Sequence, residues 1–364
     1  MNFLQKLIIF LIIYFILYTN QTYIFHQLIS KPKLYFWMRN QPELKKLRDN
    51  IKNYGDFDRY YDTLEPNKKY EYIAPIFDKS IILKKYVKEQ FNHNLFSKEN
   101  ALPYIINMFT TPRTIFGQWK GDSIFRTDFS KRGPNNRLKE FYMQGLQQID
   151  LDNYRKVFAK YFDENVKKNL KVDYFDFIQD INIDLTYLVH YNRLPTQRDR
   201  EDCYLFIHAV RSYHFTPEFI DKQIRNLDGF FKRNMMYIQQ SKKENCLIGK
   251  WVKYGNIPDN DIFMEFIHNI LGMAINWTNM MYSYVLEYGK GNIPPIPNDK
   301  TSLKPYLYET IRYINPVRYT ASKSKKPEMF GSKNDNLMVV HDLKLPTRMP
   351  EFFEADTDKF MIDR

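Results

Sequence analysis

The chain has 364 residues, of which 44% are hydrophobic and 17% aromatic, a composition that excludes general disorder and allows a large core. The formal net charge of +12 indicates either lysines spread along many helices or attraction to an anionic partner, such as a membrane surface or an acidic redox partner. The basic residues are dispersed along the chain instead of clustering with aromatics, so no nucleic-acid partner is predicted. Two cysteines, Cys203 and Cys246, are too few for a disulfide framework and fit a reducing compartment.

An unbroken apolar run from Leu7 to Tyr18 lies near the N-terminus. It is shorter than the roughly 20 residues that span a bilayer comfortably. No small-residue cleavage site follows it, which favours an uncleaved signal anchor, with a cleaved signal peptide as the alternative. More basic residues follow the run than precede it, so the positive-inside bias places the body of the protein on the cytosolic side. The sequence therefore predicts a single-pass membrane anchor in residues 1–22 and a basic, proline-containing hinge in residues 23–40.

Residues 41–364 are predicted to form one domain, mainly α with a small β component. The connections between periodic segments are short, which suits a single compact helical body. Helices are expected at 43–52, 80–92, 100–109, 135–149, 152–169, 174–191, 197–213 and 217–243. Strand signals are confined to residues 70–75 and to short pieces after residue 316, such as 337–341.

The segment 262–288 predicts a helix of about 40 Å that crosses the whole domain. Its residues are apolar nearly all round, except for one polar stripe at steps of three and four. The stripe consists of Glu265, Asn269, Gly272, Asn276, Asn279, Ser283 and Glu287. The asparagines argue against a transmembrane span, because each amide would be costly in lipid. Either the stripe packs against polar partners on other helices, or it faces a wet groove.

The segment 303–314 predicts a helix that holds an ion pair inside the protein. Glu309 and Arg312 are three residues apart and lie one turn apart on a helix. The other face carries an apolar stripe at helical spacing, Leu303, Leu307, Ile311 and Ile314. A solvated face normally shows several charges, and this segment offers tyrosines beside the pair, so both faces are expected to be covered.

The order of features around this pair resembles the C-terminal part of the cytochrome P-450 family, the haem-thiolate monooxygenases. The Glu309-x-x-Arg312 helix is followed by a turn at Asn315-Pro316 and then by a Met349-Pro-Glu-Phe-Phe segment. The last element, Phe360-Met-Ile-Asp-Arg364, is similar to the family's Phe-x-Pro-Glu-Arg-Phe. The resemblance is most specific over residues 301–364.

This resemblance implies a helical cytochrome P-450-like fold, a haem cofactor and the oxidation of an apolar small molecule by dioxygen, with electrons from a reductase. Glu309, Arg312 and Arg364 would form a structural ion network. The long central helix would pass over the haem, with Thr278 and Asn276 on the oxygen side. In its dioxygen-groove segment Ala274 and Thr278 match the family, whereas Ile275 replaces the family's glycine and Trp277 its acid.

The resemblance also implies residues that hold the haem. Arg318 would meet a haem propionate. In the family a Trp-x-x-x-Arg on an early helix assists; here Trp119 lacks an arginine at the matching place, and Arg126 follows soon after. The family's Phe-x-x-Gly-x-x-x-Cys-x-Gly loop, whose thiolate binds the iron, would follow Arg364, whereas Cys203 and Cys246 come far too early. The chain is thus interpreted as a C-terminally incomplete member, or as a haem-free relative anchored in a membrane.

Other chemistries find little support in the sequence. Glu265-x-x-His268 has the spacing of half a di-iron carboxylate site, but no second such motif is present. His208 and His214 do not share a helix face as zinc ligands would. Phosphate-binding loops, dinucleotide-binding turns and serine-hydrolase elbows are absent from the sequence.

Overall fold

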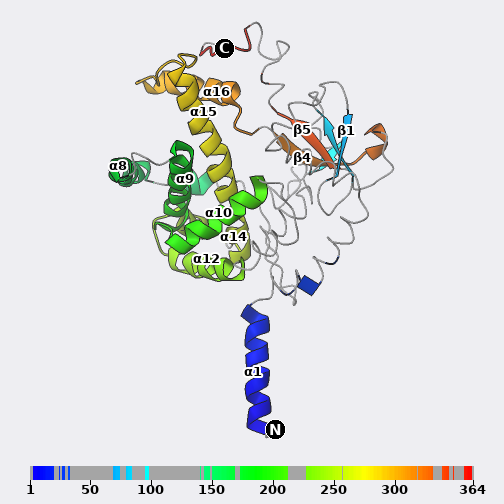
Figure 1. The fold of residues 1–364 in the computed structure, drawn as a ribbon. Helices are drawn as coiled ribbons and strands as arrows, with labels where there is room; N and C mark the ends of the chain where they lie inside the picture. Colours follow the sequence, from blue (N-terminus) through cyan, green and yellow to red (C-terminus); the bar gives the residue numbers. More distant parts are fainter. Residues whose placement is uncertain are drawn as a thin grey trace.

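The structure is a computed structural model. It describes residues 3–19, 24, 27–28, 32, 69–73, 79–83, 95–97, 140, 143–147, 150–168, 173–211, 227–255, 257–317, 319–330, 338–343, 347 and 356–362. Helices dominate this part of the chain, which confirms the prediction of a mainly helical protein. Figure 1 shows a helical body beside a small sheet, with one helix projecting from the body.

The helical body is built around a long central rod. The rod consists of α14 (Asp259–Leu271), a π-helix η3 (Gly272–Trp277) and α15 (Thr278–Gly289), close to the predicted 262–288. α9 packs along all three parts, and α10 and α12 pack against α14 (Figure 1). The bounds of the surrounding helices are α8 (Leu151–Lys168), α9 (Tyr174–Tyr191), α10 (Gln197–Arg211), α12 (Leu227–Ser241) and α13 (Leu247–Tyr254).

Aromatic contacts dominate the core between these helices. Tyr187 of α9 meets Phe266 of α14 edge to face, with ring centroids 5.2 Å apart. Phe231 of α12 meets Phe263 in the same way at 4.7 Å. Such pairs add about 0.5–1.5 kcal/mol each beyond the burial of their area. The apolar residues of α14 therefore hold the rod in the centre of the body.

The helix ends follow from local capping. The Asp173 carboxylate accepts hydrogen bonds from the backbone N–H groups of Phe175 and Asp176, so α9 begins there. Asn192 then takes a left-handed conformation (φ 53°) and ends it. Asp299 and Asn315 bound α16 (Lys300–Ile314) in the same way.

The sheet has five strands in the order β1-β2-β5-β4-β3. Their bounds are β1 (Lys69–Ile73), β2 (Lys79–Leu83), β3 (Phe96–Ser97), β4 (Tyr319–Ser324) and β5 (Met338–Asp342). β2 and β5 are parallel, and the other neighbours are antiparallel. A short 3₁₀ helix, η4 (Pro327–Phe330), follows β4. The expected helix at 80–92 is wrong at its start, because Ile81 and Ile82 pair with Val339 and Val340 of β5; local periodicity does not contain such distant pairing.

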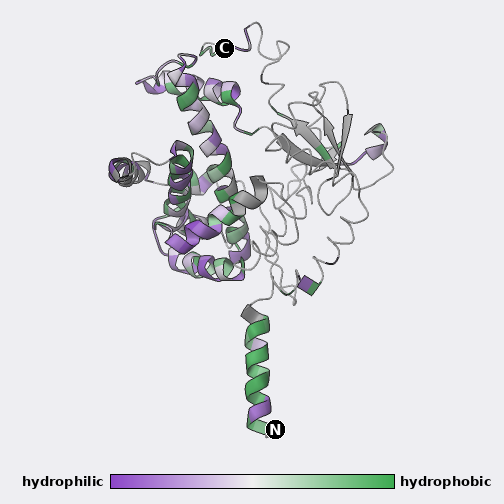
Figure 2. Ribbon diagram, in the orientation of Figure 1, coloured by the Kyte–Doolittle hydropathy of each residue, from purple (hydrophilic) through white to green (hydrophobic). Residues whose placement is uncertain are grey.

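The N-terminal helix α1 (Phe3–Thr19) stands apart from the helical body (Figure 1). It is apolar along nearly its whole length (Figure 2), and its described side chains are exposed. Among the residues that the structure describes, no helix is both long enough and apolar enough to cross a membrane.

Candidate functional site

The Glu309–Arg312 pair is buried on the inner face of α16. Arg312 donates from Nε to Glu309 Oε2 and from a terminal nitrogen to Glu309 Oε1, both at 2.7 Å. The two residues are 5% and 6% exposed. Two parallel bonds of this kind are the strong, geometrically specific form of an Arg–carboxylate contact. The predicted internal ion pair is therefore present in the structure.

The remaining donors of Arg312 bind backbone oxygens far along the chain. One terminal nitrogen donates to the carbonyls of Thr347 and Thr357, both at 2.7 Å. The other donates to the carbonyl of Lys359 at 2.8 Å. Together with the two bonds to Glu309, these contacts use all five N–H donors of the guanidinium group. Glu309 Oε1 in turn accepts the backbone N–H of Met361 at 2.8 Å.

Aromatic side chains enclose this network. Phe360 lies between Tyr306 and Tyr313 of α16, with ring centroids 5.3 and 6.0 Å apart. The Tyr306 hydroxyl donates to the carbonyl of Pro294 at 2.7 Å and lies 2.8 Å from the Tyr284 hydroxyl of α15. Burial raises the pKa of Tyr306, and the neighbouring Tyr284 hydroxyl adds to the shift. The pair thus ties α16 to the segment 357–361, while Tyr306 ties α16 to α15.

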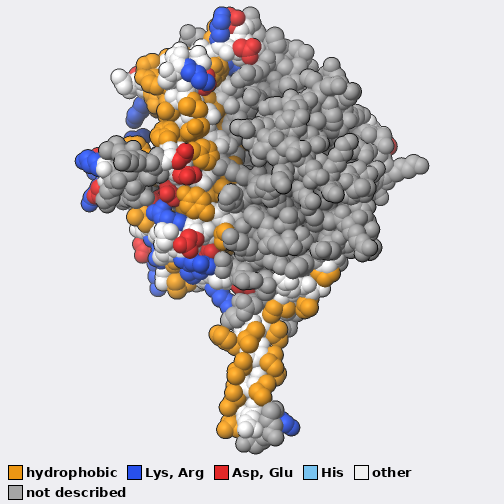
Figure 3. Space-filling model, in the orientation of Figure 1, with side chains coloured by type: hydrophobic (Ala, Val, Ile, Leu, Met, Phe, Trp, Pro, Cys, Tyr) orange, Lys and Arg blue, Asp and Glu red, His pale blue; other side chains and the backbone are white. Residues whose placement is uncertain are grey.

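The expectation that both faces of α16 are covered is wrong. Leu307 and Ile311 are each 43% exposed, and Tyr308 is 65% exposed. Figure 3 shows hydrophobic side chains on the surface over α15 and α16. The segments around Thr347 and Thr357–Met361 contact the face that carries Glu309 and Arg312, so the apolar stripe on the other face turns outward.

Polar side chains of α9 contact the central rod. Asn182 donates to the Thr278 hydroxyl at 3.0 Å, and Gln179 donates to the Ala274 carbonyl at 3.0 Å. The Asn269 amide lies 3.3 Å from His190 Nε2. Of these residues only Asn269 belongs to the predicted polar stripe, so for Asn269 the first of the two interpretations is confirmed: a polar partner on another helix satisfies its amide.

The two residues predicted for the oxygen side lie in different surroundings. Thr278 is fully buried against α9, where its hydroxyl accepts the hydrogen bond from Asn182. Asn276 is partly buried, and its neighbour Trp277 is 48% exposed. No contact that the structure describes brings Thr278 and Asn276 together. Their assignment to the oxygen side stays a prediction.

The other site residues predicted from the sequence lie outside the described residues. These are Arg364 of the ion network, and Arg318, Trp119 and Arg126 for the haem. In the described part of the chain, the partners that complete the Arg312 network are backbone carbonyls. Sequence reasoning missed them because a backbone oxygen carries no residue-type signal.

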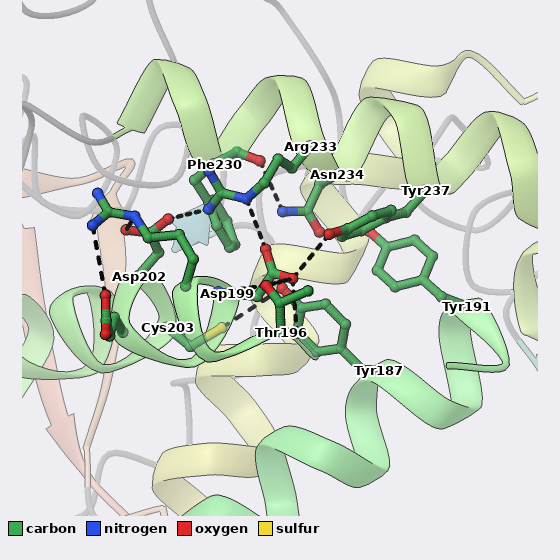
Figure 4. Close-up of polar contacts among 12 residues, drawn as sticks. Tyr187, Tyr191, Thr196, Asp199, Asp202, Cys203, Phe230, Arg233, Asn234 and Tyr237 are labelled. Carbon is green, nitrogen blue, oxygen red and sulfur yellow. Dashed lines mark hydrogen bonds and ion pairs between the residues drawn. The ribbon is translucent and has the colours of Figure 1, made fainter. Parts of the chain in front are cut away.

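A second polar cluster joins α10 to α12 (Figure 4). Asp199 accepts hydrogen bonds from Arg233 Nε at 2.9 Å, from the Tyr237 hydroxyl at 3.0 Å and from the Thr196 hydroxyl at 2.6 Å. Burial alone would raise the pKa of Asp199, but these bonds outweigh it and lower the pKa below its usual value. Asp202 also pairs with Arg233, and burial raises the pKa of its carboxyl. The charged and polar groups of this cluster bond to one another, so the cluster holds α10 and α12 together.

The two cysteines do not fit the role of an iron ligand. Cys203 lies in α10 beside the Tyr187 hydroxyl, and Cys246 precedes α13 with its Sγ 3.4 Å from the Ser241 carbonyl oxygen. Both are fully buried, and burial raises the pKa of both thiols. Metals bind the thiolate, which this environment disfavours. Nor does the described part of the chain contain a group of three or more potential metal-ligating side chains.

Comparison with solved structures identifies the fold. The structure is similar to P-450 BioI in complex with hexadec-9Z-enoic acid ligated acyl carrier protein, with 13% identity, a TM-score of 0.59, and 84% of this chain and 81% of that chain covered. It is also similar to cyanobacterial CYP120A1 bound to retinoic acid, with 11% identity, a TM-score of 0.59, and coverage of 85% and 76%. For CYP109E1 from Bacillus megaterium in complex with testosterone, the identity is 15%, the TM-score 0.57, and the coverage 78% and 75%.

Comparison of sequences alone finds no such match. None of the protein-family models matches this chain, and neither does any curated protein. At 11–15% identity the similarity to the solved structures shows the fold and not the activity. The resemblance that the motifs around Glu309 and Arg312 predicted is thus confirmed at the level of architecture, and the chain has the cytochrome P-450 fold.

Proposed function

We propose that this chain belongs to a haem-dependent monooxygenase of the cytochrome P-450 type, which oxidises an apolar substrate with dioxygen and electrons from a reductase. The observation that carries the proposal is the fully bonded Arg312 network inside a cytochrome P-450 fold. A buried ion pair is costly unless every group is satisfied, and here every donor of Arg312 is bonded, which supports a fixed arrangement around α16.

The haem is a proposed cofactor, and the described residues do not supply its iron ligand. Cys203 and Cys246 are buried thiols whose raised pKa favours the protonated form. We therefore propose that the ligand comes from a cysteine loop encoded after Arg364. Bound haem would supply oxygen activation. Among the described residues, Glu309 and Arg312 would hold α16 against the segment 357–361.

An apolar substrate is supported by the molecules bound to the similar structures. They are a hexadecenoic acid carried by acyl carrier protein, retinoic acid and testosterone. Each has a large hydrocarbon body, which an apolar pocket would bind. Substrate specificity is a property of the pocket and not of the fold, so we propose only the class of molecule for this chain.

A haem-free relative is the second candidate function. The burial of Cys203 and Cys246 favours it, because burial raises the pKa of both thiols and so disfavours the thiolate that binds iron. Such a protein would use the same fold for binding without chemistry, held at a membrane by its N-terminal segment.

A carbon monoxide difference spectrum of the reduced full-length gene product separates the two candidates. We expect the absorbance band of a thiolate-ligated haem if the protein is a monooxygenase. Reading the messenger RNA past codon 364 shows whether a Phe-x-x-Gly-x-x-x-Cys-x-Gly loop follows. A complete gene product that gives no such band and encodes no such loop is the haem-free relative.

A further inference from the structure

The central rod contains one widened turn, and that turn contacts α9. η3 (Gly272–Trp277) is a π-helix between two α-helices. π-turns of this kind are rare and occur frequently at functional sites. They interrupt the regular hydrogen-bond ladder, so the groups within the turn need support from outside the helix. Among the described helices, α9 packs along this turn.

Gln179 and Asn182 supply that support from a single face of α9. Gln179 Nε2 donates to the Ala274 carbonyl inside the turn at 3.0 Å. Asn182 Nδ2 donates to the hydroxyl of Thr278, the first residue after the turn, at 3.0 Å. Both side chains are almost completely buried. Burying an amide costs free energy unless the amide is hydrogen-bonded. Gln179 and Asn182 are therefore favourable at these buried positions only because they bond to the turn and to Thr278.

The contact continues along α9 toward its C-terminus. Thr186 donates to the Asn182 carbonyl at 2.7 Å and also contacts the Met273 sulfur of η3 at 3.4 Å. His190, one turn further, lies beside Asn269 of α14. These positions follow each other at steps of three and four, so they form one polar ladder along α9.

The rod leaves open space beside the same turn. At Gly272, apart from its chain neighbours and the helix's own backbone, no heavy atom of the described residues lies within 4 Å of the position that a Cβ would take. Asn276, four residues on and also in the turn, is partly buried. The α9 ladder bonds to Ala274 and Thr278 and contacts Met273, and no described bond from it reaches Gly272 or Asn276. The turn is thus held by α9 at Met273, Ala274 and Thr278, whereas the side that carries Gly272 and Asn276 is open.

We propose that Gln179 and Asn182 are positioning residues that hold η3 in its widened form and thereby set where Gly272 and Asn276 lie. The holding role follows from the contacts alone. That the open side receives dioxygen or substrate rests on the function proposed above. Neither residue would touch the reacting molecule, and both would act through the backbone of the turn.

Hydrogen–deuterium exchange on the full chain tests the holding role. The variants are Gln179→Met and Asn182→Leu, which keep similar volume and remove the donors. Gln179→Asn is a milder variant that keeps the amide and shortens its reach. We expect the amides of residues 272–278 to exchange about tenfold faster in the first two variants, the effect of losing one net hydrogen bond. The matched control is Asn234→Leu, which removes a buried amide of α12 that bonds Phe230 and Tyr191, away from the turn.

A thiol reporter at Asn276 tests the positioning role without any need for haem. In an Asn276→Cys background, we measure the rate of maleimide labelling with and without Gln179→Met or Asn182→Leu. Cys203 and Cys246 are fully buried, so the chain without the reporter provides a low background. We expect the labelling rate to change at least threefold with the α9 variants and to stay the same with Asn234→Leu, because a general loss of stability does not move Asn276 selectively.

The outcomes separate this proposal from the proposed function. Unchanged exchange at 272–278 in the folded Gln179 and Asn182 variants overturns the holding role. Faster exchange with an unchanged labelling rate overturns the positioning role, as does an equal response to Asn234→Leu. Absence of the carbon monoxide band contradicts only the proposed monooxygenase function. It leaves the present proposal unaffected, because the exchange and labelling measurements use the chain without haem.

Discussion

At the scale of single residues, Arg312 has the most demanding surroundings among the residues that the structure describes. Its guanidinium group donates hydrogen bonds to the Glu309 carboxylate and to three backbone carbonyls from other parts of the chain. A lysine carries the same charge but not the planar fork, so it cannot reach the same set of acceptors. The geometry of the group, more than its charge, holds this region together.

Arg312→Lys is therefore expected to destabilise the protein by about 1–3 kcal/mol for each buried acceptor that loses its hydrogen bond. Urea unfolding of the full chain measures the change. The control is Arg155→Lys, since Arg155 pairs with Asp152 at the same spacing but both side chains are largely exposed. That variant should change the free energy of unfolding by less than about 0.5 kcal/mol. Equal effects of the two substitutions would mean that Glu309 and Arg312 are not buried in solution.

At the scale of elements, α9 and α16 show the same rule. In each helix a polar face, and not only an apolar stripe, is turned inward. α9 buries Gln179, Asn182, Thr186 and His190 against the rod. α16 buries Glu309 and Arg312 and exposes Leu307 and Ile311. For α16 the helical spacing identified both faces, but which face is buried depends on the segments that pack against it.

His190 makes the α9 ladder sensitive to acid. Its Nδ1 lies 2.8 Å from the Thr186 carbonyl, which can only accept, so Nδ1 carries the proton and Nε2 accepts from Asn269. The ring packs against Trp251 and Phe266. Burial lowers the pKa of His190 to about 4 from an ordinary value of 6.5, although the bond to Thr186 opposes the shift.

Between pH 6.5 and 4 the unfolded chain binds a proton at His190 that the folded chain does not, so stability falls as the pH falls through this window. The loss from this group reaches at most about 3 kcal/mol at pH 4. We expect urea unfolding of the wild type to weaken more steeply across the window than that of His190→Gln, which has no titrating ring. Parallel stability curves for the two proteins would show that folding does not lower the pKa of His190.

At the scale of the whole molecule, the apolar helix α1 contrasts with the polar, basic body. Its described side chains are exposed along the helix, and Figure 3 shows α1 projecting from the body with hydrophobic side chains on its surface. Exposed apolar area of this extent is typical of a surface that binds a membrane or another protein. We propose that α1 holds the protein at a membrane with the body on the cytosolic side, and that the net charge of +12 strengthens contact with anionic lipid.

Flotation with vesicles that contain phosphatidylserine measures this association. The full chain should float with the vesicles, and a chain that lacks residues 1–22 should not. Ile12→Lys is the finer variant, because it places one charge in the middle of α1 and should reduce the floating fraction several-fold. The proposal is wrong if the shortened chain floats as well as the full chain does.

The sequence by itself determined the helices with strong periodicity and the pairing of Glu309 with Arg312. The expected helix 174–191 agrees with α9, and the expected 262–288 lies within the rod of α14, η3 and α15. Helical period, caps and side-chain spacing are local properties, so one sequence contains them.

Only the tertiary structure decided which distant groups meet. It brought the carbonyls of Thr347, Thr357 and Lys359 to Arg312, turned Leu307 outward, and paired residues 80–83 with β5. It also showed that Gln179 and Asn182 support the π-turn. These outcomes depend on contacts between segments far apart in the chain, and backbone oxygens look alike in every residue. Local spacing therefore specifies the elements, whereas burial and long-range bonding select their faces and partners.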